Sequence, residues 1–275
     1  MKKKIDFLYL ISLASFIVFA SALCSCTAEA ILFDEFRKEP QQQEPPDETP
    51  KMTITTNAVQ MAIFLAGSGT AEIDWGNGKE NVTLSANFPG TPITRSYSSE
   101  TTRTIIISGD NITGVNCNAN KITSIVLNEI TTLTVLRCSE NSLTDLETEQ
   151  NIALRELYCN KNQLSALNIE NNTALEIFNC AENDLTVLNV ENNIMLQWLI
   201  CADNKLSNFN ITANNNAIYW LDCQNNLFNT AQLNSLFGAL HSEDIAGGKT
   251  IAISGNSGAG TANRSIAETK GWKVE

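Results

Sequence analysis

Six cysteines divide the second half of this 275-residue chain into segments of nearly constant length. Successive cysteines are 21 residues apart four times and 22 residues apart once, and their positions are Cys117, Cys138, Cys159, Cys180, Cys201 and Cys223. A sequence that repeats itself every 20 to 50 residues or so, at about a fixed period, is typical of chains that stack one short unit on the next. Residues 112–228 are therefore predicted to form a solenoid of six repeats, each of which contacts only its neighbours.

Each repeat combines a strand pattern with an apolar back. In the third repeat, Leu157 and Cys159 alternate with Glu156 and Tyr158, which is the period of two that marks a strand with one buried face. Leucines recur in the second half of the unit, so that the segments share the pattern LxxLxCxxNxLxxLxI. Because 21 residues per turn leave no room for a long helix, the far side of each turn is predicted to be extended or 3₁₀.

This pattern resembles the leucine-rich repeat, and more narrowly the 21-residue cysteine-bearing repeats of internalin-like adhesins on bacterial surfaces. The resemblance implies a parallel sheet of six strands whose outer, concave surface is open to partners. It also implies that the asparagine of the pattern turns inward and hydrogen-bonds the backbone of a neighbouring turn. This asparagine occurs as Asn120, Asn141, Asn162, Asn183, Asn204 and Asn226. The first and last repeats depart from the pattern, since Ile112 and Val115 replace leucines and the sixth repeat lacks its second half.

The column of cysteines is predicted to be free and buried. Six cysteines in a secreted chain allow three disulfides by number alone. However, in-register parallel strands lie about 4.8 Å apart with parallel Cβ directions, whereas a disulfide needs Cβ atoms about 3.8 Å apart that face each other. A straight line of thiols also cannot form a tetrahedral metal site. The six thiols are therefore expected to act as small buried apolar groups.

The first 51 residues carry targeting signals rather than a fold. Three lysines precede a largely apolar run of 17 residues from Phe7 to Leu23, which is too short to span a bilayer and is typical of a signal peptide. The string LCSC at its end resembles a bacterial lipobox, which implies a lipid on Cys26; a plain cleaved signal is the alternative. Residues 26–51 hold four of the six prolines and are predicted to be an extended tether, although the apolar stretch 31–36 could instead form an amphipathic contact. The chain is thus expected to be anchored in the cell envelope, at the outer membrane or cell surface, and to contact the membrane only through its lipid.

Residues 52–111 are predicted to be a small β domain that covers the open end of the first repeat. Short apolar runs at 53–56, 59–66, 71–75 and 102–107 are separated by turns, and Asn77-Gly78 is a strong hairpin signal. The strings IDWGNG and RSYSSETTRTIIISG resemble the PKD-like bacterial immunoglobulin-like module. The match is reduced, because Asn77 stands where that motif usually has aspartate and the glycine of its later strand is missing.

Residues 229–275 are predicted to form an α/β cap. Thr230 is expected to cap a helix with one apolar face, made of Leu233, Leu236, Phe237 and Leu240. A strand at 249–254, a second helix at 261–270 and a closing strand at 272–274 are expected to follow, and His241 is expected at the surface. The predicted fold class is mainly β with short helices: a leucine-rich repeat solenoid with a parallel sheet, between an N-terminal Ig-like or PKD-like β cap and this C-terminal cap.

The composition of the chain argues against several classes of function. Acidic residues outnumber basic residues by 30 to 18, and the net charge of −12 argues against nucleic acid as a partner. One histidine and no clustered Cys/His spacing leave no catalytic residue, metal site or cofactor site to name. The glycines at 255–260 lack the register of a phosphate loop, and Asp74 and Asp110 lack the spacing of a calcium loop. A binding protein rather than an enzyme is predicted.

The outward positions of the strands predict where a partner binds. Apolar bulk increases toward the C-terminal repeats, and the predicted contact residues are Tyr158, Ile177, Trp198, Ile200, Trp220 and Asp222, with Gln224 on the rim. Aromatic anchors within a polar rim are typical of a protein-binding surface. A glycan stacked on the tryptophans is the alternative ligand. A purely structural Trp198–Trp220 stack is the alternative role.

Overall fold

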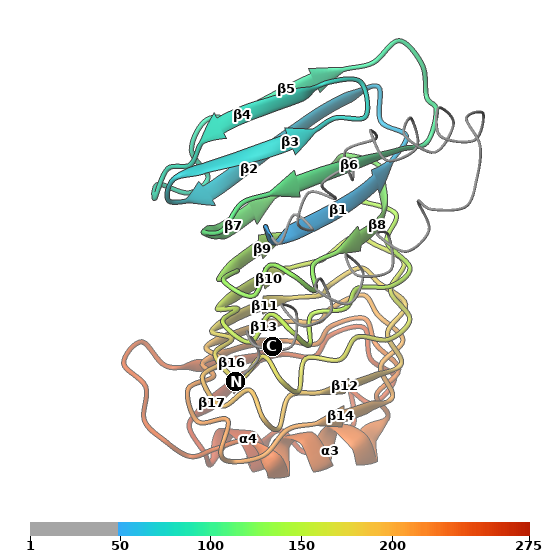
Figure 1. Cartoon of the computed structure of the whole chain (residues 1–275). Coiled ribbons are helices and arrows are strands. Elements are labelled where there is room, and N and C mark those ends of the chain that lie inside the picture. Colours follow the sequence, from blue (N-terminus) through green and yellow to red (C-terminus); the bar gives the residue numbers. More distant parts are fainter. Residues whose placement is uncertain (1–48) are drawn as a thin grey trace, which may run out of the picture. The chain divides into compact units, whose positions relative to one another are not determined.

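The cysteine-bearing segments form a parallel sheet in a computed structural model that describes residues 49–275. The candidate signal peptide, Cys26 and nearly all of the candidate tether lie outside the described residues. The six repeats supply strands β7 (Ile112–Asn116), β9 (Val135–Arg137), β10 (Glu156–Tyr158), β11 (Ile177–Asn179), β13 (Trp198–Ile200) and β15 (Trp220–Asp222). Each strand pairs in parallel with the next and in the same register, so that equivalent residues of successive repeats lie side by side (Figure 1).

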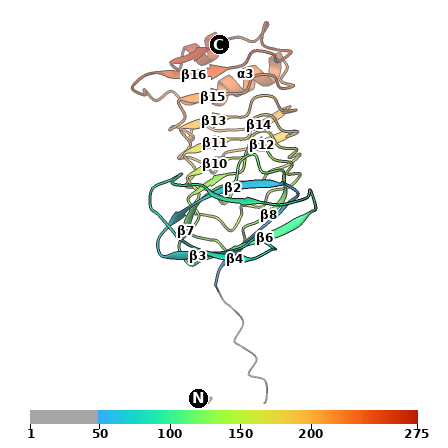
Figure 2. The same ribbon diagram turned by 90° about the horizontal axis from the view of Figure 1, so that it is seen from above.

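Each turn of the solenoid buries its leucines and its cysteine. The central residue of every short repeat strand is buried, and the cysteine that follows the strand is fully buried. The far side of the turns is built from bends and extended segments; after the first repeat and within the described range, only β12 (Val187–Asn189) and β14 (Asn208–Asn210) pair as strands there. Figure 2 shows these two strands on the side opposite β10, β11, β13 and β15. The architecture is therefore a mainly β solenoid of leucine-rich repeats, as predicted.

The predicted asparagine ladder connects each turn to the one before it. The amide nitrogen of Asn183 donates to the carbonyls of Cys159, Cys180 and Ala181 at 3.0–3.2 Å, and its Oδ1 accepts from the N–H of Leu164 at 3.0 Å. Asn141, Asn162, Asn204 and Asn226 repeat this arrangement. These side chains satisfy backbone groups that the bend leaves without partners, so the inward orientation is confirmed and the role is structural.

A second asparagine ladder, which the pattern analysis missed, runs parallel to the first. Its members are fully buried and are Asn151, Asn172, Asn193 and Asn215. Asn172 Nδ2 donates to the carbonyls of Thr148 and Asn151, at 2.9 Å each. The spacing of 21 or 22 residues was present in the sequence, but the repeat pattern LxxLxCxxNxLxxLxI ends before these positions. Each turn of the solenoid is therefore tied to its neighbour at two places.

One hydrogen bond to the second ladder, made by the Thr148 hydroxyl, can be tested directly. The Thr148 hydroxyl lies 2.9 Å from Asn172 Oδ1, whereas Asn151 Oδ1 and Asn193 Oδ1 are buried without a partner. The position one repeat later is Ile169, which has no hydroxyl. Thr148→Val is expected to lower the free energy of unfolding by about 1–2 kcal/mol, because it leaves the Asn172 carbonyl unsatisfied at nearly constant volume. Urea unfolding measures the change. Thr148→Ser, which keeps the hydroxyl, should retain most of the stability, and equal losses in both variants would refute the hydrogen-bond explanation.

The residues before the first repeat add strands to both sides of the solenoid. They form β1 (Lys51–Thr56), β2 (Gln60–Gly67), β3 (Thr70–Asp74), β4 (Lys79–Thr83), β5 (Ile93–Ser96) and β6 (Arg103–Ser108). Strand β2 pairs antiparallel with β7, and β1 pairs antiparallel with β8 (Ile122–Val126); both partners belong to the first repeat. The β module and the solenoid thus share two sheets, in the orders β4-β3-β6-β1-β8 and β5-β2-β7 and onward.

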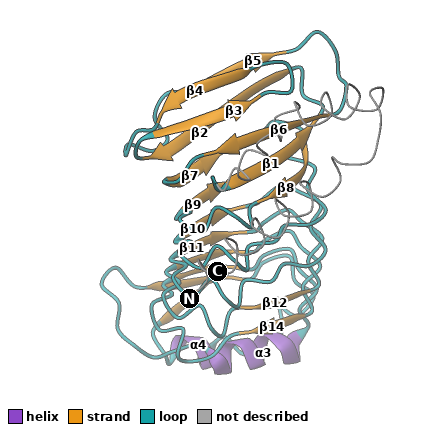
Figure 3. Cartoon of the chain, viewed as in Figure 1, coloured by secondary structure: helices purple, strands orange, loops and turns teal. Residues whose placement is uncertain are grey.

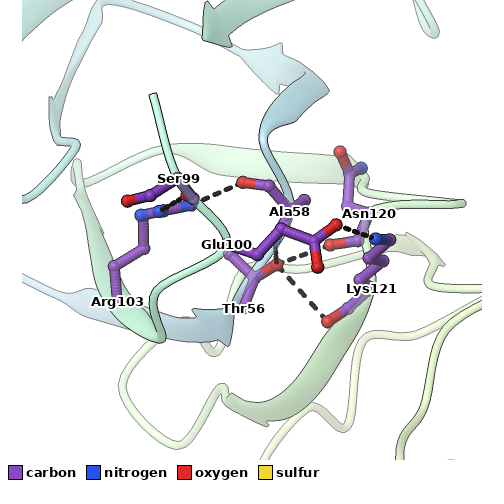
Figure 4. A network of polar contacts seen from close by, with 7 residues as sticks. All are labelled: Thr56, Ala58, Ser99, Glu100, Arg103, Asn120 and Lys121. Atoms are coloured by element: carbon purple, nitrogen blue, oxygen red, sulfur yellow. Dashed lines mark hydrogen bonds and ion pairs between the residues drawn. The ribbon is translucent and has the colours of Figure 1, made fainter. Parts of the chain in front are cut away.

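Side chains reinforce this junction, as Figure 4 shows. The Thr56 hydroxyl donates to the carbonyl of Asn120 at 2.6 Å. Asn120, the first rung of the ladder, exchanges hydrogen bonds with the backbone of Ala62 on β2. Lys121 forms an ion pair with Glu100 at 2.8 Å. The asparagine that links repeat to repeat elsewhere here links the first repeat to the β module.

The C-terminal segment continues the parallel sheet by two strands. Strand β16 (Lys249–Ala252) pairs with β15, and β17 (Trp272–Val274) pairs with β16, which brings the parallel run to eight strands. Asn256 hydrogen-bonds the carbonyls of Cys223 and Ile253, so it adds a rung to the first ladder. Here Ile253 takes the place of the cysteine. The repeat pattern therefore extends further than the cysteine count indicates.

The helices of this segment differ from the prediction. Helix α3 (Thr230–Ala239) is capped by Asn229, not by Thr230, and Gln232 completes a capping box with it. Helix α4 is limited to Ser265–Glu268, because residues 255–262 form turns. Figure 3 shows both helices at the C-terminal end of the stack.

The prediction that His241 lies at the surface is wrong. Its side chain is 3% exposed, with Nε2 2.8 Å from the carbonyl oxygen of Ile218 and the ring edge-on to Trp272 at 5.3 Å. The N–H of Glu243 donates to Nδ1, which identifies a neutral ring that donates through Nε2. Burial lowers the pKa of His241 accordingly. The chain after α3 folds back onto the last turns, which a helix pattern alone does not reveal.

Candidate functional site

The exposed face of the parallel sheet carries an apolar patch across three adjacent strands. Ile177 on β11 lies beside Trp198 on β13, which lies beside Trp220 on β15. Trp198 is 42% exposed, and Ile177 and Trp220 are partly exposed. Ile200 lies two residues after Trp198 on the same face of β13, and its neighbours on the adjacent strands are Asn179 and Asp222. These four apolar side chains are called the apolar patch.

The two tryptophans do not form a stacked pair. The ring of Trp198 instead packs edge-on against Tyr219, with ring centres 6.3 Å apart and an angle of 72° between the planes. No Trp198–Trp220 ring pair is found among residues 49–275. Tyr219 immediately precedes β15 and was not predicted as a site residue, because it lies outside the alternating positions of the strand. It widens the aromatic surface at the start of the strands.

Asp222 has a local structural role at the rim of the patch. Its Oδ1 accepts from the N–H of Gln224 at 3.1 Å. Asn116 and Asn179, at the same position of other repeats, make the same bond to the residue two places on. Such side chains stabilise the turn that ends a strand. Asp222 nevertheless lies next to Ile200, and it is the one acidic residue among the six predicted contact residues.

Tyr158 is the boundary of the patch because an arginine covers it. The Arg137 guanidinium lies 5.0 Å from the centre of the Tyr158 ring and 5.2 Å from that of Phe88, and it forms an ion pair with Glu156 at 3.1 Å. Burial raises the pKa of Tyr158. Tyr158 is therefore a packed residue at the edge of the open face.

Phe88 reaches this face from the loop between β4 and β5. It fills the space above Gly114, where a Cβ atom would lie 3.0 Å from the Phe88 ring. Gly114, which is a glycine at an outward position of the first repeat strand, was the only sequence signal for this arrangement. The N-terminal end of the sheet face is thus occupied by the chain itself, and the open part begins near β11.

The cysteine column supplies no reactive group. All six thiols are free and fully buried, as predicted. Burial raises the pKa of Cys159 to about 12, and the other five thiol pKa values are raised as well. Inaccessible, protonated thiols are poor nucleophiles and poor metal ligands.

Two further kinds of site are not found within residues 49–275. No three His, Cys, Asp or Glu side chains are grouped closely enough to hold a metal ion in that range. Over the same range, no helix has the length and apolar character needed to cross a membrane. The apolar patch is thus the feature of the described surface that most needs a functional explanation.

Comparison with known proteins gives structural likenesses only. The sequence matches no protein family and no curated protein. Among solved structures, a leucine-rich repeat protein of Leptospira interrogans is similar at 17% identity and a TM-score of 0.42, over 59% of this chain and 48% of that one. The functional domain of InlJ from Listeria monocytogenes, which includes a cysteine ladder, aligns at 22% identity and a TM-score of 0.30, over 62% and 50%. The internalin InlF of the same species aligns at 15% and 0.33, over 59% and 60%.

The matched regions cover about half to three fifths of the length of these three proteins. The function of this chain therefore has to be inferred from its own surface.

Proposed function

We propose that the chain is a binding protein that attaches a protein partner to the exposed face of its parallel sheet. The carrying observation is the apolar patch, in which Ile177, Trp198 and Trp220 lie side by side on adjacent strands and face outward. Burying large aromatic side chains at the centre of an interface is a main source of binding free energy. The rigid backbone of the sheet holds these side chains in place before the partner arrives, which lowers the entropy lost on binding.

The surroundings of the patch support a protein ligand. Ion pairs border it on the side of the earlier repeats, where Arg155 pairs with Glu176 and Arg137 with Glu156. Asp222 and Gln224 provide polar groups on the other side, and Ser254 hydrogen-bonds Gln224 at 2.5 Å. An apolar centre with a polar rim is the usual arrangement of a protein interface.

Trp198→Ala is expected to weaken the complex at least about 30-fold, which corresponds to about 2 kcal/mol. The free energy of unfolding should change by less than about 1 kcal/mol, since this side chain is half exposed and loses one edge contact. The partner is first identified with a photo-crosslinker placed on the rim at position 224, which leaves Trp198 intact, and the dissociation constant of the purified complex is then measured for the wild-type protein and the Trp198→Ala variant.

Val187→Ala is the matched control, because Val187 is 48% exposed on β12, on the opposite side of the solenoid. It should leave the affinity unchanged. A loss of affinity at Val187 but not at Trp198 would contradict the proposed face. If a purified glycan binds the wild-type protein but not the Trp198→Ala variant, and no protein partner is found, the ligand of this face is a glycan.

We also propose that the protein is held in the cell envelope by a lipid on Cys26, as the lipobox resemblance implies. Cys26→Ala is expected to shift the protein from the detergent phase to the aqueous phase in detergent partitioning, or to leave it unprocessed. Unchanged partitioning and processing would contradict the lipid anchor without affecting the proposal for the sheet face.

A further inference from the structure

A polar cleft of about 330 Å³ lies in the β module, apart from the parallel sheet. One wall is the turn after β3 that contains Gly76 and Asn77, and the other is the segment 96–103. Hydroxyl side chains dominate this second wall, namely Ser96, Ser98, Ser99 and Thr101. No aspartate or glutamate lines the cleft.

Arg103 forms part of the lining, and its bonds go to neutral groups. Its Nη1 donates to the carbonyl of Ala58 at 2.5 Å, and its Nη2 donates to the carbonyl of Ser99 at 2.7 Å and the hydroxyl of Thr101 at 3.2 Å. The guanidinium lies 3.7 Å from the centre of the Tyr97 ring. Figure 4 shows Glu100, the acid nearest in sequence, paired with Lys121 instead. The charge of Arg103 is therefore held in place without being neutralised.

Arg95 adds a second positive charge that is also not paired with a carboxylate among the described residues. Its Nε and Nη2 donate to Asn77 Oδ1 at 3.0 and 2.8 Å, and Asn77 lines the cleft. Neither arginine has an ion pair with a carboxylate in the described part of the chain. Burial raises the pKa of Tyr97 while both arginines oppose the rise, which places both charges near its phenol. Each guanidinium has five N–H donors, and those on Nη1 of Arg95 are not used within residues 49–275.

Asp74 and Glu80 do not line the cleft themselves, although each accepts a hydrogen bond from a residue that does. Asp74 Oδ1 accepts from the N–H of Gly76, and Glu80 accepts from the indole of Trp75 at 3.1 Å. One unneutralised guanidinium lies in the wall of hydroxyls, and a second is bound to Asn77 of the opposite wall, on a chain with a net charge of −12. Guanidinium groups match the geometry of carboxylate and sulfate, and hydroxyl groups match that of sugar hydroxyls.

We propose that this cleft binds an acidic saccharide, with its carboxylate or sulfate directed to Arg103 and its hydroxyls to the 96–101 segment, while Arg95 adds positive charge behind Asn77. The site is separate from the apolar patch and does not depend on the function proposed for the sheet. It would allow the protein to hold an acidic glycan while the sheet face binds another partner.

The test measures binding of a sulfated disaccharide, a uronate disaccharide, their neutral parents and inorganic sulfate to the full chain by calorimetry. The two acidic sugars are expected to bind more tightly than inorganic sulfate, and the neutral parents should not bind. Because the interaction is charged and partly exposed, raising the salt from about 0.05 M to about 0.5 M should weaken it several-fold. No binding of either acidic sugar, or equal binding of inorganic sulfate, would overturn the proposal.

Two variants at Ser98 test whether the negative charge of the ligand is bound in this cleft. Ser98 is exposed, and no hydrogen bond of its side chain is seen within residues 49–275. Ser98→Glu is expected to bind the acidic sugars about tenfold or more weakly than the matched Ser98→Gln, because both variants lose the hydroxyl but only Glu repels the anion. Arg95→Gln should also weaken binding, with an unchanged unfolding midpoint as evidence of an intact module. Equal affinity of the Glu and Gln variants would show that the anion is not bound in this cleft.

Discussion

Replacing Asn183 with aspartate is expected to lower the free energy of unfolding by about 3–5 kcal/mol. Asn183 is 8% exposed, and its amide nitrogen serves three carbonyl oxygens, those of Cys159, Cys180 and Ala181. A carboxylate has nearly the same shape but cannot donate, so each of the three carbonyls loses one of its two donors, and a buried negative charge faces them.

Chemical denaturation followed by circular dichroism measures this loss. The control is Asn171→Asp, the same exchange in the preceding repeat at an exposed side chain whose amide lies 3.4 Å from the carbonyl of Glu149. It should change the stability by less than about 0.5 kcal/mol. Similar losses at the two positions would mean that added negative charge, and not the ladder, is responsible.

Leu157→Ala is expected to cost about 2–5 kcal/mol through the cavity that it leaves. Leu157 is fully buried at the centre of β10, where its strand neighbours are Leu136 and Phe178. Both neighbours are held in register by the sheet, so neither repeat can move in to fill the space without breaking strand pairing.

The same exchange at Leu227, which is 58% exposed, provides the control. Leu227→Ala should leave the unfolding midpoint nearly unchanged. If Leu157→Ala were equally mild, the repeats would have to repack independently of the register of the sheet, contrary to the close packing expected of a protein core.

Much of the fold could be predicted because its determinants are periodic. The spacing of the cysteines gives the repeat length, and alternation around Leu157 gives the buried face of each strand. The prediction failed where the period is interrupted or the marker residue changes. The insertion that contains α3 lengthens one unit, and Ile253 stands in place of a cysteine, so the two C-terminal strands were not recognised as part of the sheet.

In the candidate site, too, the residues at periodic positions could be predicted and the others could not. The outward positions of Trp198 and Trp220 follow from the register and are found side by side. Phe88 could not be placed, because it comes from an irregular loop and meets Arg137 and Gly114 of the sheet through long-range contacts. His241 was misplaced for a similar reason, since only tertiary packing brings Ile218 and Trp272 to its ring.

The double attachment of each turn to the next has a consequence for how such a chain can change in evolution. Both asparagine ladders bond residue to residue across one repeat, and the two ends of the sheet are built by segments of other design, β2 with β5 and β16 with β17. Loss or duplication of a whole 21-residue unit would preserve every rung and both ends, and would shorten or lengthen the face by one strand, roughly 4.8 Å. The 22-residue unit between Cys201 and Cys223 keeps its rung as well, so the requirement is that the unit added or lost is a whole turn. The exposed sheet face can therefore lengthen or shorten among related chains only by whole strands.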